Sequence, residues 1–337
     1  MKSLIAILLI VFLYPLLAWV SSSNSLFEAF GPETPLMQVN ASLGLAIPSH
    51  YVNRADPKKV RIGGQLISEG RADTPQGKSN YISRFYACTS CHNTVREEED
   101  ISKVDSELRL DYAIEHQLPY LQASTFWGIV NRVAWYNGDY IKKYGDLVIA
   151  ANKSLEESIQ LCAQECSQGR ELEAWEMEAM LHYLATLELK VGDLALSKEE
   201  INQLNDGSAS NQNKLNLIAS KYLPRSPATF AEPPNDKNRG YGMKGNVERG
   251  KAIYELGCQH CHKEDGVSDL VLDDAKKTFK WLRNNISADS QNSIYEIIRH
   301  GTYAEYGHRE YMPLYTQEKM SDQQVEDLRF YIQEMAY

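Results

Sequence analysis

Beyond its first 25 residues the chain has no apolar run long enough to span a membrane and no alternating pattern typical of a β-strand. It also lacks an excess of positive charge. Its formal net charge is −10 at pH 7, which argues against nucleic acid as a partner. Acidic proteins are steered toward positive patches, so we expect a partner protein with a basic surface. The 337 residues are enough for two or three small domains, and we expect these to be helical.

The N-terminus carries the one long apolar run. Lys2 precedes an apolar stretch over residues 4–20, and small polar residues follow. This pattern is typical of an export signal, so we expect the body of the protein in the periplasm, outside the cytoplasmic membrane. The run is close to the lower limit of about 17 residues for a spanning helix. It is therefore either cleaved near residues 21–23, which leaves a soluble protein, or kept as a membrane anchor.

Cysteine is scarce, yet four of the six cysteines occur in two copies of the pentapeptide C-x-x-C-H. Chance would supply roughly 0.003 copies of this pattern. A structural zinc site needs four ligands, and no further cysteine or histidine pair stands near the first copy. A redox dithiol does not require the histidine. Haem attachment uses all three residues, because each cysteine bonds one vinyl group and the histidine binds the iron.

We therefore expect two covalently bound haem c groups. The residues predicted to attach them and to supply the proximal iron ligands are Cys88, Cys91, His92, Cys258, Cys261 and His262.

Each pentapeptide stands between two predicted helices. Before the first, Asp56 and Pro57 suit a helix start and Gly70 suits its end. In the last helix, Ser321 and Gln324 predict a capping box. Glycines in the opening helices would let the terminal helices of each copy cross closely. The predicted helix faces are Val60, Gly63, Gly64 and Ile67; Met177, Leu181, Leu184 and Leu187; Val247, Gly250 and Tyr254; and Val325, Leu328 and Ile332.

In this layout, residues 55–337 resemble class I c-type cytochromes in tandem. The resemblance implies an all-α fold of two tandem cytochrome c-like helical domains, the first enlarged by a long loop insertion. Residues 225–242 are rich in proline, glycine, asparagine and charge, which indicates a linker. The expected boundaries are 1–25 for the signal peptide or membrane anchor, 26–205 for cytochrome c domain 1, 206–245 for the linker and 246–337 for cytochrome c domain 2.

The resemblance also implies a methionine as sixth iron ligand just before the last helix. Met312, in "REYMPLY", occupies that place, and Pro313 would stiffen the loop. A thioether is soft and neutral, so it favours ferrous iron and raises the potential. With two axial positions filled, the second haem would have no open site, which is the coordination of an electron carrier.

The first copy has no Met-Pro before its last helix. Instead, "SIQLCAQECSQG" (158–169) contains Cys162 and Cys166. This motif resembles the first domain of thiosulfate dehydrogenases and related sulfur-oxidising dihaem cytochromes, which implies Cys162 as an iron ligand. A Cys162–Cys166 disulfide is an alternative in an oxidising compartment. Other candidate ligands for the first haem are Met177, Met180, His182 and His116.

The thiosulfate dehydrogenase family places arginines beside its cysteine ligand, whereas this chain has Ser158 and Glu165 there. Glu165 would repel a sulfur dianion, although Arg132 or Arg170 could compensate. Asn131, Arg132 and Asp139 could tie down the long loop or meet a haem propionate. Its aromatic residues are expected to pack over a haem: Trp127, Trp135, Tyr136 and Tyr140.

The expected function is an exported dihaem cytochrome c that carries single electrons in a respiratory chain, with no catalytic residue assigned. One alternative is a thiosulfate dehydrogenase-like oxidoreductase acting on small sulfur anions at the first haem. Another is a haem subunit of a larger membrane respiratory complex.

Overall fold

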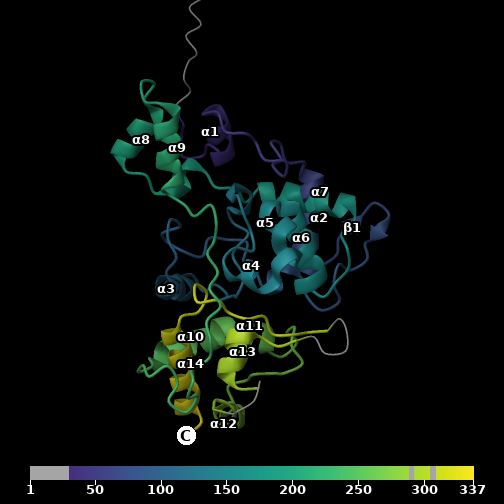
Figure 1. Ribbon diagram of the computed structural model, residues 1–337. Coiled ribbons are helices and arrows are strands. Elements are labelled where there is room, and N and C mark those ends of the chain that lie inside the picture. Colours follow the sequence, from purple (N-terminus) through teal and green to yellow (C-terminus); the bar gives the residue numbers. More distant parts are fainter. Residues whose placement is uncertain (1–29, 288–291, 304–308) are drawn as a thin grey trace, which may run out of the picture.

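The computed structural model describes residues 30–287, 292–303 and 309–337; the predicted signal or anchor segment lies outside them. Figure 1 shows an elongated helical molecule, with α1, α8 and α9 near one end and α12 near the other. The prediction of a helical protein is confirmed. Strand structure in the described residues is limited to a two-stranded antiparallel hairpin of β1 (Asp73–Thr74) and β2 (Gly77–Lys78) and two isolated bridges.

The helices lie as follows. They are α1 (Leu36–Ser42), α2 (Pro57–Glu69), α3 (Ser106–His116), α4 (Asp139–Tyr144), α5 (Ile149–Lys153), α6 (Leu155–Leu161), α7 (Ala174–Ala185), α8 (Lys198–Asn205), α9 (Asn211–Ala219), α10 (Val247–Ile253), α11 (Gln259–His262), α12 (Lys276–Asn285), α13 (Ile294–His300) and α14 (Asp322–Met335). Short 3-10 turns are η1 (Cys88–Ser90), η2 (Ile129–Asn131), η3 (Gly145–Val148) and η5 (Val191–Leu194), and π-helical turns are η4 (Cys162–Cys166) and η6 (Tyr254–Cys258).

Helices α2 and α7 cross at a glycine, as predicted. The Asp56 carboxylate accepts hydrogen bonds from the backbone N–H groups of the first turn of α2, and Gly70 ends the helix at φ 71°. A Cβ on Gly63 would overlap the carbonyl oxygen of Ala179 in α7. The predicted stripe on α7 is partly wrong, because the helix ends before Leu187 and the more deeply buried methionine is Met180.

Helices α10 and α14 form a second crossing of the same kind. A Cβ on Gly250 would overlap the carbonyl oxygen of Asp327 in α14. The capping box of Ser321 and Gln324 is present at the start of α14. The predicted buried stripe of Val325, Leu328 and Ile332 is confirmed, with each residue 1% exposed. Tyr254 is buried as predicted, but it begins the π-helical turn η6 and not the last turn of α10.

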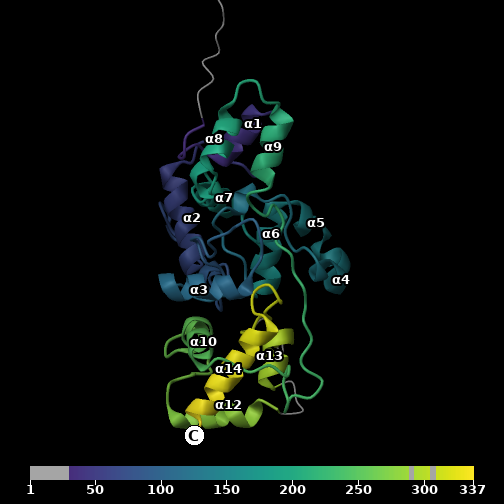
Figure 2. The same cartoon turned by 90° about the vertical axis from the view of Figure 1, so that its left-hand side faces the viewer.

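Helix α3 belongs to the core of the C-terminal part. Leu110 and Ala113 of α3, together with Tyr120, pack in one cluster with residues of α10, α12, α13 and α14. In Figures 1 and 2, α3 lies directly beside α10. The Tyr120 hydroxyl donates to Gln324 Oε1 (2.9 Å), and its backbone N–H donates to the Leu256 carbonyl (2.9 Å). The two halves therefore share α3 and do not have fully separate cores.

The segment 225–242 runs along one side of the molecule (Figure 2). It is hydrogen-bonded to both parts: the Ala228 carbonyl accepts from Asp139 N–H (2.8 Å), and the Thr229 carbonyl accepts from Gln317 N–H (2.9 Å). Helix α9 falls within the residues 206–245 expected as a linker, and it packs with α1 and α8 in a cluster of its own. No helix in the described ranges has the length and apolarity needed to cross a membrane.

The glycine crossing of α2 and α7 predicts the effect of Gly63→Ala. Alanine is the better helix former by about 1 kcal/mol, but its methyl group would collide with backbone that has no rotamer to change. We expect a net loss of about 1–3 kcal/mol in the free energy of unfolding, measured by chemical denaturation followed by helical circular dichroism. Gly207→Ala is the control, because a Cβ there meets no atom within 4 Å. Equal stability of the two variants would contradict a close crossing.

Candidate functional site

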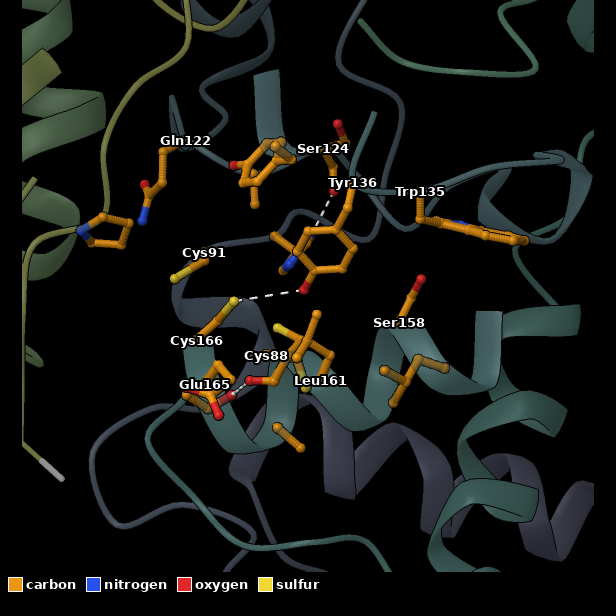
Figure 3. Close-up of a pocket in the computed structure, with 18 of the residues that line it drawn as sticks. Cys88, Cys91, Gln122, Ser124, Trp135, Tyr136, Ser158, Leu161, Glu165 and Cys166 are labelled. Atoms are coloured by element: carbon orange, nitrogen blue, oxygen red, sulfur yellow. Dashed lines mark hydrogen bonds between the residues drawn. The ribbon is translucent and has the colours of Figure 1, made fainter. Parts of the chain in front are cut away.

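A cavity of about 490 Å³ has the first pentapeptide in its wall, and residues from both halves of the chain line it. Cys88, Cys91 and His92 line it, together with apolar side chains of α2, α6 and α7. The apolar lining includes Leu66, Ile67, Leu155, Leu172, Met180 and Leu184. Figure 3 shows Cys88 and Cys91 close to the π-helical turn η4.

His92 is held in one orientation by its Nδ1 atom. The Nδ1–H group donates to the Ser124 carbonyl at 2.6 Å, and the ring stacks on Phe126 with centroids 4.3 Å apart. Burial lowers the pKa of His92 to about 4, so the imidazole is neutral near pH 7. With Nδ1 protonated and bonded, Nε2 carries the lone pair. A backbone carbonyl in this position is the usual support of a metal-binding histidine.

His262 of the second pentapeptide has the same support. Its Nδ1–H group donates to the Leu270 carbonyl at 2.9 Å, and burial lowers its pKa. Neither His262 nor the cysteines of its motif line the first cavity. Met312 does line it, and also packs against the C-terminal core. Two hydrogen bonds join Thr302 to the Met312 backbone. Thr302 Oγ1 accepts from the Met312 N–H at 2.7 Å, and the Thr302 N–H donates to the Met312 carbonyl at 2.8 Å.

The two pentapeptides are in contact, which the sequence alone did not predict. The Cys261 thiol donates to the Ser90 carbonyl at 3.7 Å, and the His260 ring is hydrogen-bonded to the Thr89 backbone. Next to this contact, the hydroxyl of Tyr86 donates to the carbonyl oxygen of Tyr311 at 2.7 Å. Groups attached at the two motifs would therefore lie close together.

Cys162 and Cys166 both lie in the cavity wall, at the ends of η4 (Figure 3 labels Cys166). All six cysteines are free thiols in the structure. The Tyr136 hydroxyl donates to Cys166 Sγ at 3.6 Å. A hydrogen bond from Cys162, supported by that of Tyr136, lowers the pKa of Cys166, whereas the same bond to Cys166 raises the pKa of Cys162. Both thiols line the cavity of the first pentapeptide, and Cys162 as an iron ligand stays a prediction.

The other ligand candidates fall in different places. Met180 lines the cavity, 2% exposed, whereas Met177 does not line it. His182 Nδ1 accepts from the Asp56 N–H at 3.0 Å, outside the cavity. His116 is exposed and stacks on Tyr112. The structure therefore brings Met180, but neither histidine, to the first pentapeptide.

Of the two arginines considered as compensating charges, only Arg132 lines the cavity. Arg170 points elsewhere, because its guanidinium is paired with Glu176 at 2.6 Å and bonded to the Tyr81 carbonyl. Glu165 is exposed but also lines the cavity. A second cation, Lys319, reaches the cavity from the C-terminal part. Sequence reasoning missed Lys319, and no local motif marks it.

Three of the four predicted loop aromatics, Trp135, Tyr136 and Tyr140, line the cavity, and Trp127 packs instead near α1. Asp139 ties the loop to the linker by accepting from the Phe230 N–H at 2.9 Å. The indole N–H of Trp135 is buried without a hydrogen-bond partner. An apolar cavity with two cysteines, a neutral imidazole and cations fits a flat apolar macrocycle that bears carboxylates. The residues present thus fit haem c.

Residues 247–336 match the cytochrome c family model. No curated protein matches the chain. The C-terminal part is thus a cytochrome c domain, of a kind that carries covalently bound haem c and transfers electrons. The match includes the second pentapeptide, and the first pentapeptide lies outside it.

The geometry of η4 predicts two alkylatable thiols. If Cys88, Cys91, Cys258 and Cys261 carry haem, then Cys162 and Cys166 alone remain, unpaired as in the structure. Denatured, unreduced protein treated with iodoacetamide should gain two alkyl groups, both on the peptide containing η4, as read by mass spectrometry. The Cys166→Ser control should gain one. An unmodified peptide lighter by two hydrogens would instead establish the Cys162–Cys166 disulfide.

Proposed function

We propose that the chain is an exported dihaem cytochrome c that carries single electrons in a respiratory chain. The observation that carries the proposal is the direct contact of two C-x-x-C-H segments whose histidines are held alike. In both, Nδ1–H donates to a backbone carbonyl, at 2.6 Å for His92 and 2.9 Å for His262. This leaves Nε2 of each imidazole oriented for an iron atom. One such segment belongs to a recognised cytochrome c domain, and its equivalent supports the same role for the first.

The residues of the two pentapeptides would have two roles in the proposed protein. Cys88, Cys91, Cys258 and Cys261 would anchor the macrocycles by thioether bonds, and the histidines would fix the iron positions. Haem c supplies reversible one-electron chemistry when bound. Because Cys261 touches Ser90, an electron entering at one motif would have only a short path to the other.

Met312 is the proposed sixth ligand at the second haem. Its loop is restrained on both sides, since Thr302 bonds its backbone twice and Pro313 follows it. A restrained thioether keeps the coordination similar in both oxidation states, which suits rapid electron exchange. The acidic chain, with a net charge of −10, would attract a redox partner with a basic surface.

The N-terminal apolar segment supports export to the periplasm, with the protein either soluble or tethered. A tether would also suit a permanent haem subunit of a membrane respiratory complex. This third function shares the same haem sites and differs only in the partner.

A thiosulfate dehydrogenase-like oxidoreductase is the second candidate, and the thiols of η4 in the cavity wall favour it. Arg132 also lines that cavity, as an oxyanion site would need. Two features oppose it. Glu165 stands at the cavity next to Cys166, and Arg170 is already occupied by Glu176. We therefore place the carrier first.

Haem content tests the proposal directly. The pyridine haemochrome assay should give two haems per chain that acid-acetone does not extract. Cys88→Ser and Cys261→Ser should each lower the count toward one, and Cys162→Ser should leave it at two, because that cysteine is outside both pentapeptides. One haem in the wild-type chain, or extractable haem, would contradict the dihaem proposal.

Ligation by Met312 predicts the behaviour of Met312→Ala. The ferric protein should lose its weak far-red sulfur–iron absorption, one haem should fall in potential, and that haem should bind carbon monoxide. These changes follow from replacing a soft thioether by an open position. Met335→Ala is the matched control, because Met335 is 39% exposed at the end of α14. Survival of the far-red band in Met312→Ala would assign Met312 to the core alone.

A further inference from the structure

Two cations from opposite halves of the chain line the cavity of the first pentapeptide. Arg132 comes from the long loop that follows η2, and Lys319 comes from the turn before α14. Lys319 is well buried, with a side chain 13% exposed. Burying a charge in an apolar cavity costs free energy unless the charge is paired. Arg132 and Lys319 therefore each need a partner that offsets this cost.

The carboxylates near Lys319 are largely engaged already. Glu97 is 4% exposed and accepts hydrogen bonds from Arg109 and from the amide of Asn93. Lys319 Nζ is 3.5 Å from Glu97 Oε2, a longer contact than a direct hydrogen-bonded pair usually makes. Glu98 is also near, and burial raises the pKa of its carboxyl group. Burial and the neighbouring Arg109 lower the pKa of Lys319 to about 8.

Arg132 is still less well paired. Its guanidinium donates to the Thr125 carbonyl at 3.4 Å. No carboxylate within the described ranges forms an ion pair with it, and burial lowers its pKa. Three cations, Arg109, Arg132 and Lys319, thus stand against the two carboxylates of Glu97 and Glu98. The cluster has one positive charge in excess, and two of the cations face the cavity.

We infer that Arg132 and Lys319 form the carboxylate site for a propionate of the haem attached at Cys88 and Cys91. This inference rests on the proposed function. Haem c is attached through its vinyl groups and carries its two propionates at the opposite edge. A propionate would supply the missing negative charge.

The site has a structural consequence, because Lys319 belongs to the C-terminal part. Its backbone carbonyl already accepts from Arg109 Nη1 at 3.2 Å, and α14 begins at Asp322. A propionate bound to both cations would join the long loop of the first half to the turn before α14. The first haem would then hold the two halves of the chain together.

Resonance Raman spectroscopy of Lys319→Met in the mature protein tests this site. The bending mode of a haem propionate follows the hydrogen bonds that its carboxylate accepts, and a merely structural lysine would not move it. We expect that mode to shift for one haem, with a fall in the midpoint potential of the same haem, because a negative charge is left uncompensated. Lys319→Arg keeps the charge and should restore most of both signals. Lys277→Met, at an exposed lysine of α12, should change neither.

The Glu97→Gln variant distinguishes the contact of Lys319 with the propionate from the contact of Lys319 with Glu97. It removes an anion and should raise the potential, and it leaves the Lys319 contact with the propionate in place. If Lys319→Met does not mature, Lys319→Arg and Arg132→Lys carry the test, each with a smaller shift of the same mode. An unmoved mode in every Lys319 and Arg132 variant, with two haems counted, would overturn the site and leave the dihaem proposal intact. A count of one haem per chain would instead contradict the proposed dihaem function, on which the propionate site rests.

Added sulfate and thiosulfate distinguish a free oxyanion from the propionate. Neither should alter the spectrum of the mature wild-type protein, because the two cations are already neutralised. A saturable shift with either anion that is lost in Lys319→Met would assign the pair to a dissolved anion and reject the propionate.

Discussion

The packing of α3 and Tyr120 into the C-terminal core is the contact on which the relative position of the two pentapeptides depends. Tyr120 bonds to Leu256, just before the second motif, and to Gln324 in α14, while the Tyr315 hydroxyl donates to the Tyr120 carbonyl at 3.1 Å. Arg249 of α10 adds ion pairs to α3. Because these bonds lie within one cluster of buried residues, the two motifs cannot separate without opening that core.

The positions of the buried charged side chains follow from the same packing. Arg109 projects from α3 into the contact, where it meets Glu97 and the carbonyl groups of Leu121 and Lys319. A buried ion pair adds little net stability against apolar packing, but the loss of one partner costs several kcal/mol, roughly 3–5. Such a pair fixes the relative position of the segments that carry its two partners more than it stabilises the fold. Here it fixes the turn that carries Lys319 against the loop that follows His92, and the first cavity therefore has walls from both halves.

Local features of the fold could be predicted from the sequence, and contacts between distant segments could not. The Asp56 cap, the glycines of α2 and α10 and the capping box of α14 each depend on residues within one or two helical turns, and all are observed. The sharing of α3, the contact of Cys261 with Ser90 and the bond of Tyr136 to Cys166 join residues far apart in the chain. A single sequence has no periodicity or spacing that reports such pairs.

The two motifs share one support and differ in their surroundings, and this difference would set the direction of electron flow in the proposed dihaem protein. Axial ligand, burial and nearby charge are the means by which a protein tunes a haem. The first cavity offers the Cys162 and Cys166 thiols, tyrosines and two cations, whereas Met312 is the ligand proposed for the second haem. The surroundings are not independent, because Met312 also lines the first cavity and Tyr311 is bonded to Tyr86 beside the first motif. The segment of Tyr311 and Met312 therefore belongs to the surroundings of both pentapeptides.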